Sequence, residues 1–170
     1  MDGLLILILF IFAAYRSVKL DITNDEAFSF LNVDMLNTHM MYGTANTHWL
    51  NSFFMLIENT VLGHEPWQLR IHSVLSIALF AFFLLNIFRE KFSSWLLLTP
   101  VTLLLLNPYL IDYFSLARGY ALSIAFETIA FYYIIQQKKE NTQNIYFFSS
   151  LATLSNYTCI YFLYCFFLLE

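Results

Sequence analysis

The sequence predicts an all-α protein, a polytopic bundle of transmembrane helices with a long first external loop. Of its 170 residues, 59% are hydrophobic and only 12% are charged, whereas a soluble domain has about 25% charged residues. Nineteen Phe and eleven Tyr residues leave too few polar side chains to cover a water-soluble globule. The net charge is -4 and the sequence has no basic run, so it lacks the features typical of a protein that binds nucleic acid.

Five apolar segments are predicted to span the membrane, each from the hydropathy of its own run. They cover residues 3–18, 67–88, 94–106, 118–136 and 145–169. The acidic start of the first segment argues against a cleaved signal peptide. The last apolar run reaches the final residue, so we expect a fragment of a longer protein with further helices.

The external loop, residues 19–66, is predicted to carry two short helices. Thr23-x-x-Glu26 fits a capping box, so a helix should begin there and continue to about Leu36. A second helix is expected over residues 48–62, with apolar side chains on one face and polar side chains, including His48, on the other. This pattern suits a helix that lies in the membrane interface.

The distribution of basic residues predicts the orientation of the spans. The loops after the second and fourth spans share one side and hold Arg89, Lys91, Lys138 and Lys139. The positive-inside rule places that side, and with it the amino terminus, in the cytoplasm. The loop 19–66 and the segment 107–118 then face the external side, although Arg16 and Lys19 argue mildly against this orientation.

Two adjacent carboxylates, Asp25 and Glu26, are the first candidates for a functional site. The capping box accounts for Glu26 but leaves Asp25 unexplained. A carboxylate held near a membrane surface can act as a general base. Arg70 and Arg118 lie at the external ends of spans, where a guanidinium either snorkels to the interface or binds a phosphate group.

Other polar residues admit simpler interpretations. His39 and His48 could join Asp25 as ligands of a divalent metal ion, but their spacing is not diagnostic, and His48 is more simply a substrate or hydrogen-bonding contact. Glu127 is the one carboxylate well inside a span, where we expect an internal hydrogen bond or ion pair. Asp112 is expected to be solvated.

Four short motifs occur in a fixed order along the external side of the predicted spans. They are Asp25-Glu26 after the first span, His48-x-x-Asn51 at the start of the interfacial helix, Pro66-Trp67-x-x-Arg70, and Ala117-Arg118-Gly119-Tyr120. In this order they resemble the amino-terminal part of a GT-C glycosyltransferase, of the kind related to protein O-mannosyltransferases and aminoarabinose lipid A transferases. The resemblance covers most of the chain from Leu4 to about Ile135.

The resemblance implies an enzyme of a cell membrane, such as the bacterial inner membrane. Such an enzyme moves a sugar from a polyprenyl-phosphate donor to a protein, lipid or glycan hydroxyl on the external side, usually with inversion. Asp25 would be the catalytic base, and Arg118, with Arg70, would stabilise the phosphate. The implied substrate-binding residues are Glu26, His48, Arg70, Arg118 and Tyr120. The family's proline-rich segment is replaced here by residues 44–47, which leaves the acceptor open.

Two other classes remain open on the sequence. In a transporter or flippase fragment, Glu127 and Arg118 would line a substrate path, but the internal repeats on which many transporters are built are not evident. A non-catalytic membrane subunit is the third class. Gly-rich phosphate loops and the sequence signatures of zinc proteases or serine acyl-enzymes are missing, which argues against the soluble nucleotide-using folds.

Overall fold

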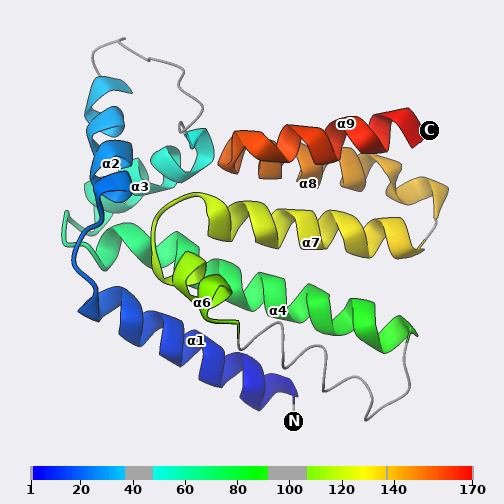
Figure 1. The fold of residues 1–170 in the computed structure, drawn as a ribbon, viewed down its shortest axis with the longest axis horizontal. Coiled ribbons are helices and arrows are strands. Elements are labelled where there is room, and N and C mark those ends of the chain that lie inside the picture. The colour runs from blue at the N-terminus through cyan, green and yellow to red at the C-terminus, as the bar shows by residue number, and fades with distance from the viewer. Residues whose placement is uncertain (1, 37–47, 92–106, 137, 170) are drawn as a thin grey trace.

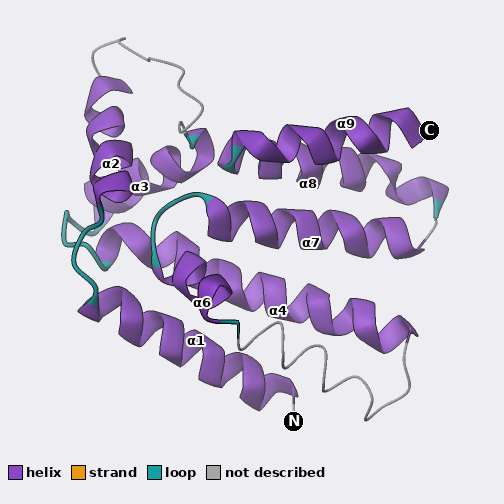
Figure 2. Ribbon diagram, viewed as in Figure 1, coloured by secondary structure: helices purple, strands orange, loops and turns teal. Residues whose placement is uncertain are grey.

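The computed structural model describes residues 2–36, 48–91, 107–136 and 138–169. Within these ranges all regular secondary structure is helical, as the sequence predicts (Figure 2). The expected span over residues 94–106, and His39 with the rest of its loop, lie outside the described residues.

Five helices run along the length of the molecule. Helices α1 (Asp2–Lys19), α4 (Ile71–Lys91), α7 (Tyr120–Gln136) and α8 (Thr142–Ser155) lie side by side in that order, and α9 (Ile160–Leu169) packs on α8 (Figure 1). The predicted segments 3–18, 67–88 and 118–136 therefore form helices close to their expected bounds. Helix α7 lies between α4 and α8 and is the centre of the bundle.

The shorter helices gather at one end of the bundle. Helices α2 (Asn24–Leu36) and α3 (Trp49–Val61), the 3₁₀ turn η1 (Gln68–Arg70) and the loop before α7 meet there (Figure 1). Helix α6 (Pro108–Ser115) packs against α1 and α4 and leads into that loop. The carboxyl ends of α4 and α9 and the α7–α8 connection lie at the opposite end (Figure 1).

Local signals in the sequence set the helix ends. The predicted capping box is confirmed, because the Thr23 N–H donates to Glu26 Oε2 at 2.9 Å and the Glu26 N–H donates to Thr23 Oγ1 at 3.4 Å. Gly63 ends α3 with a positive φ of 114°. Asn107 caps α6 by accepting from the Tyr109 N–H, and Pro108 occupies the first turn.

The single span expected over residues 145–169 is wrong. Asn156 adopts an extended backbone and ends α8, and the 3₁₀ turn Tyr157–Cys159 leads into α9, which returns along α8 (Figure 1). The Asn156 side chain caps the new start by accepting from the Thr158 N–H at 3.2 Å. The sequence does mark this break with four successive polar residues at 155–158, but so short an interruption is averaged out in a long hydropathy window between two apolar runs.

Large apolar residues and alanines together fill the space between helices. The main buried cluster joins α1, α4, α6 and α7, and consists of Leu9, Ala13, Ile77, Phe80, Ala81, Leu84, Leu85, Phe114, Ala121 and Ala125. Alanine at these contacts lets helix backbones approach closely. Other large apolar side chains lie outside, as on α1, where Leu7, Ile11, Phe12 and Tyr15 are about half exposed.

Helix α3 has its polar side buried and its apolar side exposed. Its buried residues are Asn51, Ser52, Met55 and Glu58, and its exposed apolar residues are Trp49, Phe53, Ile57 and Val61. A helix on the surface of a water-soluble protein has the reverse arrangement. The amphipathic pattern that the sequence predicts is therefore present, with its polar face turned into the protein.

Judged by length and composition, Gln68–Arg89 is the one helix among the described residues that is long and apolar enough to cross a membrane. Tyr120–Gln136 and Tyr157–Leu168 are shorter apolar helices.

Candidate functional site

A pocket of about 330 Å³ opens at the end of the bundle where the short helices gather. Its lining residues come from the first turns of α2, the start of α3 and the start of α7, and are Asn24, Asp25, Phe28, Ser29, His48 and Tyr120. Three residues of the expected site, Asp25, His48 and Tyr120, thus meet in one cavity although they are separated by up to about a hundred positions in the chain.

Asp25 and Arg118 form an ion pair beside this pocket. The Arg118 guanidinium donates to Asp25 Oδ2, and the two side chains are 31% and 60% exposed, respectively. The guanidinium also lies over the Tyr120 ring, 5.6 Å from its centroid. A carboxylate and a cation that water and a ligand can both reach are therefore held side by side.

His48 contributes a hydrogen-bond acceptor to the pocket. Its Nδ1 lies 2.9 Å from the Ser155 carbonyl at the end of α8. A carbonyl only accepts, so Nδ1 carries the proton and Nε2 has a free lone pair in the neutral ring. Burial lowers the pKa of His48 and Arg118 acts in the same direction, against the Ser155 hydrogen bond and Asp25, so the ring is neutral at pH 7.

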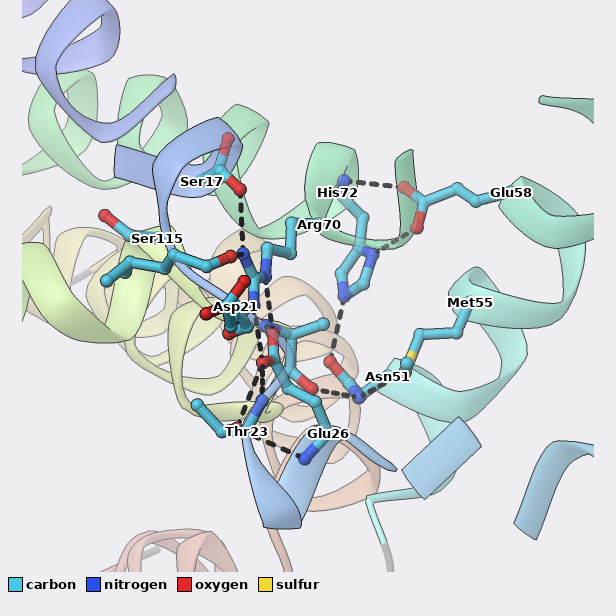
Figure 3. A network of polar contacts seen from close by, with 12 residues as sticks. Ser17, Asp21, Thr23, Glu26, Asn51, Met55, Glu58, Arg70, His72 and Ser115 are labelled. Carbon is cyan, nitrogen blue, oxygen red and sulfur yellow. Dashed lines mark hydrogen bonds and ion pairs between the residues drawn. The ribbon is translucent and has the colours of Figure 1, made fainter. Parts of the chain in front are cut away.

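Glu26 faces the protein interior and not the pocket (Figure 3). Its carboxylate accepts from Arg70 at 2.7 Å through both oxygens, from Thr23, and from the Ala117 N–H at 2.8 Å. Burial alone would raise the pKa of Glu26, but the hydrogen bonds from Arg70, Thr23 and Ala117 hold it below its ordinary value. The expectation that Glu26 binds the acceptor or orients Asp25 is not what this geometry supports.

Arg70 has no donor to spare for a phosphate group. Its side chain is 1% exposed and donates to Glu26 through Nε and Nη2. Its remaining N–H groups donate to the backbone carbonyls of Ser17, Leu20 and Asp21, at 2.6–2.8 Å. All five guanidinium N–H groups are thereby used. The expected phosphate contact of Arg70 is therefore replaced by a structural role, which ties α1 and α2 to α4.

A second buried network lies next to the first and was not predicted as part of the site (Figure 3). It links Glu58 and Asn51 of α3 to His72 of α4. Asn51 also bonds Met55 and the backbone of Ala117 and Gly119. The sequence offered two signals: the polar residues along α3 at helical spacing, which we interpreted as the polar face of an interfacial helix, and Asn51 in the His48-x-x-Asn51 motif.

The remaining polar candidates lie away from the pocket. Glu127 lies two turns into α7 and close to Cys159, and the internal hydrogen bond or ion pair expected for it stays a prediction. Asp112 pairs with Arg16 across α6 and α1, in contrast to the solvation expected for it. Among the described residues, no group of three or more His, Cys, Asp or Glu side chains could hold a metal ion.

Comparison of the chain with models of known protein families, with curated proteins and with solved structures gave no match. The functional argument therefore depends on the geometry of the pocket and its surroundings. That geometry provides a carboxylate and a neutral imidazole as proton acceptors, and a guanidinium able to bind an anion.

Proposed function

We propose that the protein is a membrane glycosyltransferase that transfers a sugar from a polyprenyl-phosphate donor to a hydroxyl acceptor, with inversion. The observation that carries this proposal is the Asp25–Arg118 pair, in which a carboxylate that lines the pocket is held beside a guanidinium able to bind an anion. The resemblance of the sequence motifs to GT-C enzymes points to the same residues.

The reaction assigns one task to each side chain. The acceptor oxygen attacks the anomeric carbon, and its proton passes to the Asp25 carboxylate. The bond from the anomeric carbon to the phosphate oxygen breaks, and the polyprenyl phosphate leaves with the electron pair. Arg118 balances the charge of that phosphate. Inversion places base and leaving group on opposite faces of the sugar, so the Asp25–Arg118 contact opens when the donor enters.

The exterior of the protein supports a membrane location. The exposed apolar faces of α1 and α3 suit contact with lipid, and the carboxyl end of α4, which contains Arg89, and the α7–α8 connection, which contains Lys138, lie at the end opposite the pocket (Figure 1). In the proposed arrangement several helices cross the membrane, with the amino terminus in the cytoplasm and the pocket on the external side. Membrane lipids and the lipid-linked donor are then the natural partners.

The transporter alternative gains less from the structure. It requires Glu127 and Arg118 to line one path, but Arg118 pairs with Asp25, and Glu127 lies two turns into α7. The described residues thus bring Arg118 to the base and not to the intramembrane carboxylate.

The test is sugar transfer from labelled polyprenyl-phosphate donors in membranes of cells that express the protein. We expect Asp25→Asn to reduce kcat by on the order of 100- to 10,000-fold, the usual range for a lost general base. Asp112→Asn is the matched control, because it removes an interhelix Asp–Arg pair of the same kind away from the pocket. Transfer unchanged by Asp25→Asn at equal expression contradicts the assignment. Loss of substrate flipping in Glu127→Gln but not in Asp25→Asn supports a transporter.

A further inference from the structure

The backbone on either side of Arg118 is held by one side chain. The Asn51 Nδ2 donates to the Ala117 carbonyl at 3.0 Å, and Asn51 Oδ1 accepts from the Gly119 N–H at 3.0 Å. Asn51 is fully buried, and the Ala117 N–H is held separately by Glu26 at 2.8 Å. Both neighbours of Arg118 are therefore fixed, and its side chain extends from this loop to Asp25, which lines the pocket.

These two backbone contacts fix the orientation of the Asn51 amide. A flipped amide would oppose NH₂ to the Gly119 N–H and oxygen to the Ala117 carbonyl, so Oδ1 and Nδ2 are assigned without ambiguity. Oδ1 then also faces His72 Nε2 at 2.8 Å, and that nitrogen must carry a proton. The second Nδ2 hydrogen points to the Met55 sulfur at 3.3 Å, which completes the four hydrogen bonds of the amide.

Glu58 holds His72 in the orientation that this contact needs. One carboxylate oxygen accepts from the His72 backbone N–H at 2.7 Å, and the other lies 2.8 Å from Nδ1. Since Nε2 already carries a proton, a second proton lies between Nδ1 and Glu58. The buried pair thus fixes the ring, and the ring fixes the Asn51 amide.

We propose that Asn51, held by the His72–Glu58 pair, is a positioning residue that orients Arg118 toward the phosphate of the donor. This inference rests on the proposed function for its kinetic consequence, although the contacts themselves do not depend on it. Asn51 touches no part of the pocket, so it acts only through the loop that carries Arg118.

The first experiment measures the loop directly and needs no substrate. Asn51→Leu preserves volume and removes the hydrogen bonds. We expect hydrogen–deuterium exchange of the peptide spanning residues 116–120 to rise at least about tenfold in detergent-solubilised protein. Asn141→Leu, at a buried Asn at the other end of the bundle, is the control and leaves that peptide unchanged. Unchanged exchange in Asn51→Leu contradicts the proposal.

The second experiment measures the consequence for transfer. We expect Asn51→Leu to lower kcat/KM for the donor by on the order of 100-fold, while the KM for the acceptor stays unchanged. In an Arg118→Ala background the same substitution should have no further effect. An equal loss in both backgrounds shows that Asn51 acts elsewhere and overturns the proposal.

A conservative variant keeps the test informative if Asn51→Leu folds poorly. In Glu58→Gln the amide can still accept from the His72 N–H and donate to Nδ1, so Nε2 keeps its proton toward Asn51. We expect this variant to retain loop protection and donor KM, whereas Glu58→Leu loses both. If the unsubstituted protein transfers no sugar from any donor, the proposed function fails, and the exchange measurements still decide whether Asn51 clamps the loop.

Discussion

At the scale of single residues, Asp25 and Glu26 are neighbours on one helix but their carboxylates have different roles. Asp25 reaches the pocket and a partly exposed arginine, whereas Glu26 points inward and accepts from a buried one. A buried carboxylate of this kind contributes to stability only while it is ionised, because its partner Arg70 stays charged at every accessible pH.

Glu26→Gln is expected to lower the free energy of unfolding by about 3–5 kcal/mol, since it leaves the Arg70 charge buried without a counter-charge. The pKa of Glu26 is lowered in the folded protein, so its contribution is complete above its ordinary value of 4.5 and is lost as the pH falls through the folded value. Thermal unfolding in detergent from pH 7 to pH 3 should therefore show a steep acid loss that Glu26→Gln reduces. Glu65→Gln, at an exposed carboxylate, is the control. An equal acid loss in all three proteins contradicts this role.

The sequence could predict part of the candidate site and not the rest. Asp25, His48, Arg118 and Tyr120 were found because motifs mark polar residues at the ends of apolar runs, and the structure brings them together. Motifs say nothing about the direction of a side chain, so Arg70 was expected in the site although its donors point into the protein.

At the scale of elements, the turn before α7 depends on Gly119. Its φ is +77°, and a Cβ there would contact the Ser155 carbonyl oxygen and lie 2.8 Å from His48 Cγ. The absence of a side chain thus lets α7, α8 and the start of α3 meet at the pocket. The Ser155 carbonyl is available to His48 Nδ1 because α8 ends at Ser155, where the carbonyls have no donor from the same helix.

Gly119→Ala should destabilise the protein and also impair the site. We expect a loss of about 1–3 kcal/mol from the strained backbone, and a fall in kcat/KM, because Cβ displaces His48 from Ser155. Gly63→Ala is the matched control. It also has a positive φ, but its Cβ meets only the end of the Gln68 side chain, at 2.9 Å. Thermal unfolding and sugar transfer per folded molecule separate the two effects. If both variants keep full transfer, the close packing at Gly119 does not matter for function.

The sequence predicted which of these segments are helical, but it did not predict the end of α8. Long apolar periodic runs identified α1, α4 and α7, and the capping box located α2. The break at Asn156 was missed because the flanking runs are apolar and a single capping amide decides the geometry.

At the scale of the whole molecule, many large apolar side chains lie on the surface, while several polar and charged side chains are buried. On α3 this places Trp49 and Phe53 outward, while Asn51 and Glu58 face the protein. A long exposed apolar surface is unfavourable in water and suits the boundary of a bilayer, where an amphipathic helix lies about 5–10 Å below the headgroups.

Trp49 should therefore contact lipid. With Trp67→Phe and Trp95→Phe, the fluorescence of Trp49 in vesicles is expected to be quenched by lipids brominated near the headgroup more than by lipids brominated deep in the chain. The same vesicles without bromine are the control. Strong quenching by aqueous iodide, with none by brominated lipid, places this face of α3 in water and argues against the membrane arrangement.

The contacts that build the pocket have one further consequence, for the order of assembly. They join residues far apart in the chain: Asn51 and Gly119 are 68 positions apart, Glu26 and Ala117 are 91, Asp25 and Arg118 are 93, and His48 and Ser155 are 107. During synthesis, Arg118 must arrive before Asp25 has its partner, and the loop around Arg118 before Asn51 has its backbone partners. Helix α8 must be complete before the Ser155 carbonyl can fix the tautomer of His48. The pocket is therefore among the last features of this segment to form, and a chain released before Ser155 leaves the imidazole without its anchoring carbonyl.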